Sequence, residues 1–124
     1  MNYLWILLLT PALALAHGED KPGPHGGAIR MPGAFHTEAI VSDTGDLYVY
    51  FLDVNFQQLS PKLFKLGAAL GSETASCTTK AERSECKFPS PLMGKTGKLV
   101  LKLQKGKGPK SEAVYELPLN GKHH

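Results

Sequence analysis

Hydrophobic and polar residues alternate along much of the chain, and the alternation begins clearly at residues 34–41, AFHTEAIV. A period of two is typical of a β-strand with one covered face. One side of the predicted strand carries Phe35, Thr37, Ala39 and Val41, and the other side carries His36, Glu38 and Ile40. The next stretch, residues 47–54, is apolar on both sides, which predicts a central strand covered on both faces.

The same alternation returns in residues 63–70, 98–105 and 112–119. The residues predicted to face the core there are Phe64, Leu66, Ala68, Leu70, Leu99, Leu101, Leu103, Ala113, Tyr115, Leu117 and Leu119. Pro118 has no N–H to donate, so the last strand lies at an edge or ends there. Seven or eight short strands with turn signals between them predict an all-β domain, a small antiparallel β-sandwich of immunoglobulin-like type or a partly open barrel.

Two cysteines, Cys77 and Cys86, predict a hairpin closed by a disulfide. Residue 77 then pairs with 86, 78 with 85 and 79 with 84, which leaves the turn near Ala81 and Glu82. Two free thiols on a metal are the alternative, but this C-x8-C spacing is not a zinc pattern. A bridge of this length stabilises a small domain by about 2–3 kcal/mol in the chain-entropy model and implies an oxidising compartment.

The N-terminal residues predict export. Residues 3–16 form an apolar run too short to cross a membrane, and Ala14-Leu15-Ala16 matches the A-x-A cleavage pattern, although no Lys or Arg precedes the run. We therefore predict a signal peptide at 1–16 and no membrane attachment after its removal. Residues 17–27, HGEDKPGPHGG, predict a flexible arm, and residues 28–121 a single β domain.

The net charge of +3 comes from lysines spread over the second half of the chain. No aromatic residues alternate with them, as a binder of single-stranded nucleic acid would require. An exported protein also has little access to nucleic acid. We interpret the lysines as solvated strand faces and loops, and we predict no nucleic-acid partner.

The histidines suggest a metal site. His17, His25 and His36 all follow the predicted signal within twenty residues, and none of the five histidines lies in the apolar middle of the domain. His36 and Glu38 stand two apart on a predicted strand, so their side chains project to the same side, roughly 7 Å apart. His25 precedes two glycines that permit positive φ and close approach of a second group.

Cleavage after Ala16 would make His17 the first residue, with its α-amine and imidazole Nδ1 available to one ion. Nitrogen ligands of this kind suit Cu(II), and also Zn or Ni. His17, His25, His36 and Glu38 are thus the predicted metal ligands, with copper as the first choice; a turn followed by an ordinary solvent-facing strand is the alternative. Met31 and Met93 are sulfur candidates for Cu(I), but packing is predicted for both.

Residues 23–27, GPHGG, the turn at Pro32-Gly33 and residues 35–38, FHTE, resemble a segment of the periplasmic adaptor subunits of heavy-metal efflux pumps. The likeness extends through the tyrosine-bearing stretch to residue 54. The chain has no room for the helical hairpin, lipoyl-like domain and barrel of a whole adaptor. The resemblance therefore implies an isolated accessory domain in the periplasm of a Gram-negative bacterium that binds the transported metal through His25, His36 and Glu38.

These observations predict a periplasmic protein that captures copper, or zinc or nickel, and hands it over in metal homeostasis or efflux, with an efflux-system protein as partner. A copper-dependent oxygenase is a weaker alternative, because the only Trp lies in the signal segment and no nucleophile or paired carboxylates stand out. The stronger competitor is a non-catalytic interaction or structural module, since a sandwich edge can accept a partner strand.

Overall fold

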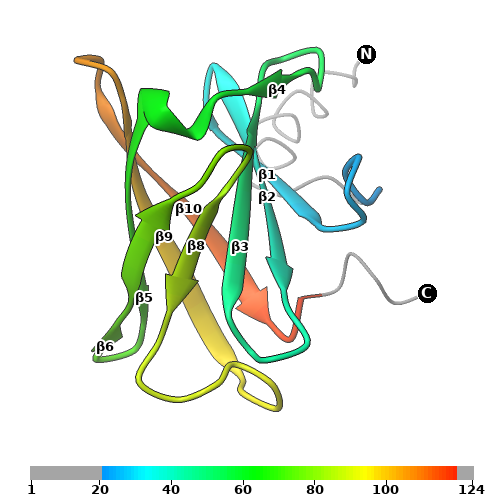
Figure 1. Ribbon diagram of the computed structural model, residues 1–124, viewed down its shortest axis with the longest axis vertical. Coiled ribbons are helices and arrows are strands. Elements are labelled where there is room, and N and C mark those ends of the chain that lie inside the picture. The colour runs from blue at the N-terminus through cyan, green and yellow to red at the C-terminus, as the bar shows by residue number, and fades with distance from the viewer. Residues whose placement is uncertain (1–20, 120–124) are drawn as a thin grey trace, which may run out of the picture.

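The structure is a computed structural model, and it describes residues 21–119. In this range the predicted all-β fold is confirmed: two antiparallel sheets face each other, and one short 3-10 turn, η2 (Pro61–Leu63), is the only helical element (Figure 1). The strands are β1 (Ala28–Gly33), β2 (Phe35–Val41), β3 (Leu47–Leu52), β4 (Gln58–Leu59), β5 (Phe64–Leu70), β6 (Glu73–Thr74), β7 (Ser76–Thr79), β8 (Ser84–Lys87), β9 (Gly97–Lys105) and β10 (Lys110–Leu117). No helix among these residues is long and apolar enough to cross a membrane.

The first sheet has six strands in the order β1-β2-β3-β8-β7, with β4 also paired to β3. Strand β3 is central, and five of its six residues are buried, as its two apolar faces predict. Antiparallel pairing of β2 with β3 sets His36 opposite Leu52 and Glu38 opposite Tyr50. This register decides which side chains meet on the face of the sheet that points away from the core.

The second sheet has four strands in the order β10-β9-β5-β6. Strand β10 is an edge strand and ends at Leu117, directly before Pro118, as predicted. The long strand β9 alternates buried leucines with more exposed residues, because one of its faces covers the core and the other meets solvent. Leu66 and Leu70 of β5 are only partly buried, but they pack against the core as expected.

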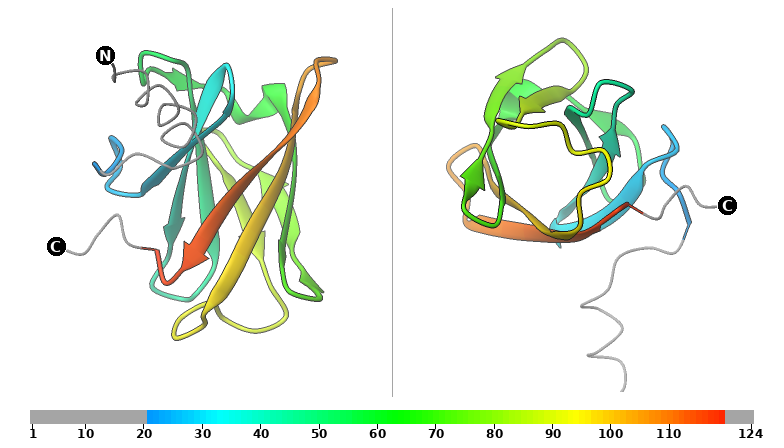
Figure 2. Two further views of the ribbon diagram at one scale, coloured as in Figure 1. Left: turned by 180° about the vertical axis from the view of Figure 1, so that it is seen from behind. Right: turned by 90° about the horizontal axis from the view of Figure 1, so that it is seen from below.

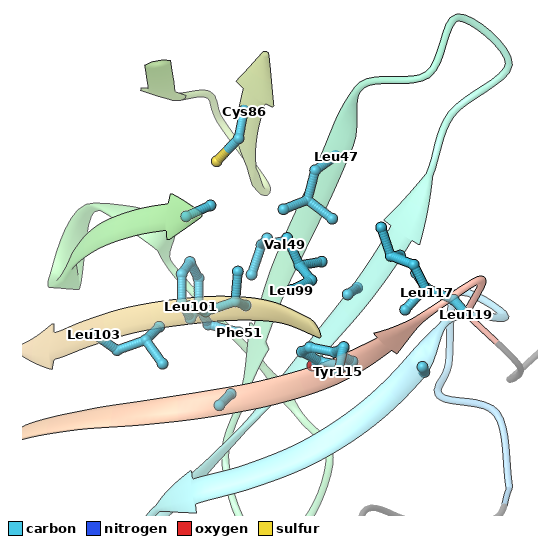
Figure 3. Close-up of a cluster of buried hydrophobic side chains, with 14 of the residues drawn as sticks. Leu47, Val49, Phe51, Cys86, Leu99, Leu101, Leu103, Tyr115, Leu117 and Leu119 are labelled. Carbon is cyan, nitrogen blue, oxygen red and sulfur yellow. The ribbon is translucent and has the colours of Figure 1, made fainter. Parts of the chain in front are cut away.

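One hydrophobic cluster fills the space between the sheets (Figure 3). Its side chains come from both sheets and include Leu47, Val49, Phe51, Cys86, Leu99, Leu101, Leu103, Tyr115, Leu117 and Leu119. The Tyr115 hydroxyl donates to the Thr37 carbonyl oxygen at 3.0 Å and lies 2.6 Å from the Thr37 hydroxyl. Burial raises the pKa of Tyr115 well above its ordinary value, so the phenol keeps its proton and joins the sheets through these bonds.

The two sheets meet along one side of the sandwich, where β1 lies next to β10. There the Arg30 Nε donates to the Val114 carbonyl oxygen at 2.8 Å, and its guanidinium lies 4.7 Å from the Tyr115 ring centroid. Viewed along the strands, the sheets surround the interior almost as a ring (Figure 2). The domain thus combines the two predicted forms, a sandwich with a barrel-like cross-section.

The β7–β8 hairpin has the predicted register: Cys77 pairs with Cys86, and residues 78 and 79 pair with 85 and 84. The predicted disulfide joins the two cysteines, and the Lys80 N–H donates to the Arg83 carbonyl across the turn. The two-residue strands β4 and β6 were not predicted, because two residues are too few to show a period.

Candidate functional site

The candidate site lies on the outer face of β2. Alternation turns Thr37 and Ala39 into the core and sends His36 and Glu38 to the opposite face, as the sequence predicts. Both of these outward residues are nevertheless buried, with exposed fractions of 3% for His36 and 0% for Glu38. Other segments therefore cover this face, and they determine what each side chain can do.

Glu38 is covered by the segment that precedes β1. Residues 23–27 form a tight loop in which the Gly26 N–H donates to the Gly23 carbonyl and the Gly23 N–H donates to the Gly27 carbonyl, both at 2.9 Å. Gly26 has φ of +82°, which glycine adopts readily. A Cβ on Gly27 would lie 2.6 Å from the Ala39 carbonyl oxygen, so only glycine fits this close to β2. The described part of the arm is thus more firmly held than its composition suggests.

The Glu38 carboxylate anchors this loop with three hydrogen bonds. Its Oε2 accepts from the backbone N–H of His25 at 2.7 Å and from that of Gly27 at 2.8 Å. Its Oε1 lies 2.7 Å from the His25 Nδ1. Buried carboxylates are costly unless they are bonded in this way, so the arm and Glu38 stabilise each other.

These contacts leave one ring nitrogen of His25 without a bond from the described chain. A carboxylate only accepts, so Nδ1 carries the hydrogen and neutral His25 keeps its lone pair on Nε2. The His25 side chain is 29% exposed and stacks on the Tyr50 ring, with centroids 3.6 Å apart and an interplanar angle of 8°. His25 is therefore fixed in tautomer and orientation while its side chain stays partly exposed.

Tyr50 is held in turn by Arg83 from the β7–β8 turn. The Arg83 Nη1 donates to the Tyr50 hydroxyl at 2.9 Å, its Nη2 lies 2.9 Å from the Glu85 carboxylate, and its guanidinium lies 3.6 Å from the Tyr48 ring centroid. The bond to Tyr50, with Glu85 as a lesser cause, raises the pKa of Arg83, which stays cationic. Neither Tyr50 nor Arg83 was predicted from the sequence as part of the site. The signal for Tyr50 was the pairing of β2 with β3, which sets it opposite Glu38.

His36 has different neighbours. Its Nδ1 lies 3.0 Å from the Asp53 carbonyl oxygen, which can only accept, and its ring stacks on Phe56 with centroids 4.1 Å apart. Both partners belong to the turn after β3, which the Asp53 carboxylate closes by accepting from the backbone N–H groups of Asn55 and Gln57. His36 thus fastens a turn to the sheet.

The structure brings His25 and Glu38 together but gives no contact of either with His36. No three His, Cys, Asp or Glu residues within residues 21–119 are grouped closely enough to hold an ion. His17 lies outside the described residues, so the four-residue metal site stays a prediction. Met31 and Met93 are 52% and 54% exposed, so the prediction that both pack in the interior is wrong.

Comparisons with protein-family models, curated proteins and solved structures found no match for this chain. The resemblance to efflux-pump adaptors therefore stays a prediction.

Proposed function

We propose that the protein is an exported, periplasmic metal-binding protein that captures a copper ion, or less readily zinc or nickel, and passes it to a partner of an efflux system. One observation carries this proposal: His25 is held on a buried carboxylate through Nδ1, and its Nε2 is left for a ligand. The disulfide supports an oxidising compartment. The task is capture and transfer, without a catalysed reaction.

The pairing of His25 with Glu38 is the arrangement that metal-binding histidines usually have. A carboxylate on the far ring nitrogen fixes the tautomer, orients the imidazole and raises its basicity toward the ion. Glu38 then acts as an orienting residue, because its oxygens are already used by three donors. The 29% exposure of the His25 side chain suits an ion that must leave as readily as it arrives.

One imidazole does not hold copper alone, so other ligands must come from segments near His25. His17, with its α-amine after cleavage, stands eight residues earlier. Eight residues span up to about 28 Å, so this group can reach the same ion. His36 is not needed, because it is occupied with Asp53 and Phe56.

The test is a copper titration of exported protein with no residues added before His17. Cu(II) affinity is measured by competition with a chelator for the wild type, His25→Ala and His36→Ala. We expect His25→Ala to weaken binding more than about 100-fold and His36→Ala to change it little. His36→Ala is the matched control, since it also removes one stacked imidazole on the outer side of the first sheet. Unchanged affinity in His25→Ala would overturn the proposal.

A second candidate is the interaction module. A groove on the outer face of the second sheet is lined by Lys65, Lys102 and Lys110 together with a single acid, Glu112. The excess of positive charge suits an acidic partner surface. Such a partner would bind with or without metal. Capture that persists in chelator and in His25→Ala, but fails when the three lysines are changed to Glu, would favour this function.

A further inference from the structure

We propose that one end of the sandwich docks on an anionic phospholipid surface. This inference goes beyond the proposed function and does not depend on metal binding. The end is formed by four connections: the β1–β2 turn, the turn between β3 and β4, η2, and the β9–β10 turn. All four lie at the upper end of the molecule in Figure 1, and the view from behind in Figure 2 agrees. We call this part of the molecule the loop end.

The loop end carries most of the large apolar side chains that are exposed in residues 21–119. Six such side chains are exposed in this range, and four of them belong to the loop end. They are Met31, Val54, Phe56 and Leu63, each between 40% and 52% exposed. A single exposed apolar residue is ordinary, but several gathered at one end of a domain are typical of a contact surface.

Contacts between the connections hold these side chains in place. The Gly106 N–H donates to the Leu63 carbonyl oxygen at 2.8 Å, which joins the β9–β10 turn to η2. His36, next to the β1–β2 turn, stacks on Phe56 in the turn after β3. The loop end is therefore formed before it meets a partner, and little conformational entropy is lost on binding.

The backbone at Phe56 supports a functional role for the exposed ring. Its φ is +64°, in the left-handed region that bulky residues rarely adopt. Such a conformation persists only where the surroundings impose it, as the Asp53 carboxylate does by closing this turn. The chain thus keeps an aromatic residue where glycine or asparagine would fit more easily, and strained positions of this kind cluster at functional sites.

Exposed lysines accompany the apolar side chains. They are Lys62 on η2, Lys65 at the start of β5, and Lys105, Lys107 and Lys110 around the β9–β10 turn. Within the described residues, none of these five lysines forms an ion pair. The only carboxylate in the four connections, that of Asp53, accepts from two backbone N–H groups. The loop end therefore has a clear excess of positive charge.

The opposite end of the sandwich has a different charge pattern. There Lys87 pairs with Asp46 at 3.0 Å, and the Lys95 Nζ lies 3.9 Å from the Glu73 carboxylate. Its lysines are thus partly neutralised by neighbouring acids, whereas those of the loop end are left to attract an external anion.

Lysines together with apolar side chains favour a lipid surface over an acidic protein. Lysines attract anionic headgroups, and apolar side chains beside them enter the boundary between the headgroups and the acyl chains. The apolar residues stand on separate connections, and a bilayer surface can receive all of them at once. Such docking is peripheral and reversible, and it departs from the sequence-based prediction of no membrane attachment.

Vesicle flotation tests the inference with exported protein. One set of vesicles contains phosphatidylcholine and phosphatidylglycerol, and the other contains phosphatidylcholine alone. The variant Val54→Ser/Leu63→Ser removes two apolar side chains from the loop end. Its matched control is Met93→Ser/Val114→Ser, since these two residues are as exposed but lie outside the loop end.

A second pair of variants tests the charge. Lys62→Gln/Lys105→Gln/Lys107→Gln neutralises the loop end, and none of these lysines lines the groove on the second sheet. The matched control, Lys87→Gln/Lys95→Gln/Lys98→Gln, removes the same charge from the opposite end. Copper affinity is measured for each variant and should stay at the wild-type value, so failure of this inference leaves the proposed function standing.

We expect the wild type to bind the anionic vesicles at least about tenfold more tightly than the neutral ones, and added salt should weaken this binding. The loop-end lysine variant should lose at least about tenfold in binding to anionic vesicles. The loop-end apolar variant should lose about fivefold, and both controls should bind as the wild type does.

The inference is overturned if the wild type does not bind anionic vesicles, or if a variant and its control lose binding equally. Unchanged vesicle binding in Val54→Ser/Leu63→Ser, together with equally tight binding of polyglutamate, would also overturn it. In that case charge alone is recognised, and an acidic protein is the better partner.

Discussion

The two faces of β2 each bury a polar side chain, but the two side chains have different partners. On the inner face, Thr37 bonds to Tyr115 from the opposite sheet, so the pair is enclosed by the core. On the outer face, Glu38 bonds to the loop of residues 23–27, which lies on the surface. The first arrangement joins the two sheets, whereas the second holds a surface loop whose His25 side chain remains 29% exposed. Adjacent residues of one strand thus serve the core on one side and, under the proposed function, the metal site on the other.

Among changes to the two faces of β2, Glu38→Ala should cause the largest loss of stability. It removes the acceptor of three hydrogen bonds and leaves two backbone N–H groups unpaired, which we expect to cost about 3 kcal/mol. Amide hydrogen exchange gives the direct measurement: His25 and Gly27 should be protected in the wild type and exchange rapidly in the variant. Glu38→Gln is the control of equal size, with an intermediate loss. Slow exchange at both amides in Glu38→Ala would show that something else holds the loop.

His36→Ala should lower stability by about 2 kcal/mol, because it removes a buried ring together with its bond to Asp53. Chemical denaturation measures the loss. His25→Ala, on the same face but partly exposed, should cost less than half as much. Equal losses of stability in the two variants would contradict the view that His36 has a structural role and that His25 does not.

On the inner face, Tyr115→Phe should cost about 1.5 kcal/mol, since it keeps the ring and removes only the hydroxyl that bonds to Thr37. Denaturation measures the change, and copper affinity should stay at the wild-type value. A substantial drop in copper affinity would mean that the two faces of β2 are coupled.

Alkaline pH probes the same hydroxyl. The pKa of Tyr115 is raised in the folded protein by burial, so its contribution to stability is fully present below the ordinary tyrosine pKa of about 10 and is lost as pH rises above it. Denaturation between pH 9 and pH 11 should show a shallower decline in Tyr115→Phe than in the wild type. Parallel declines in the two proteins would mean that other groups cause the alkaline loss.

The smallest effect is expected from Tyr50→Leu. This change removes the ring on which His25 stacks and keeps the bond between His25 and Glu38. Copper affinity should fall only a few-fold, because orientation is set mainly by the carboxylate. A loss as large as that of His25→Ala would assign the main orienting role to the stack.

The fold was largely predictable because its determinants are local. Strict alternation located β2, β9 and β10 and their buried faces, and two cysteines fixed the register of the β7–β8 hairpin. Strands of two residues carry no such signal.

The site was predictable only in part. The sequence placed His36 and Glu38 on one side of a strand, but an acidic residue there reads as solvent-facing, since lone carboxylates are seldom buried. The docking of residues 23–27 depends on two contacts between distant parts of the chain: Gly27 against the Ala39 carbonyl and Glu38 against backbone N–H groups. Periodicity does not report such contacts, so the loop appeared to be a free arm.

The residues that hold His25 in place are connected to the disulfide. Tyr50 is held by Arg83, and Arg83 lies in the turn of the hairpin that Cys77 and Cys86 cross-link. A chain whose cysteines stay reduced keeps every residue of the site but lacks the link that steadies this turn. Maturation of the site is thereby tied to the redox chemistry of the surroundings in which the chain folds.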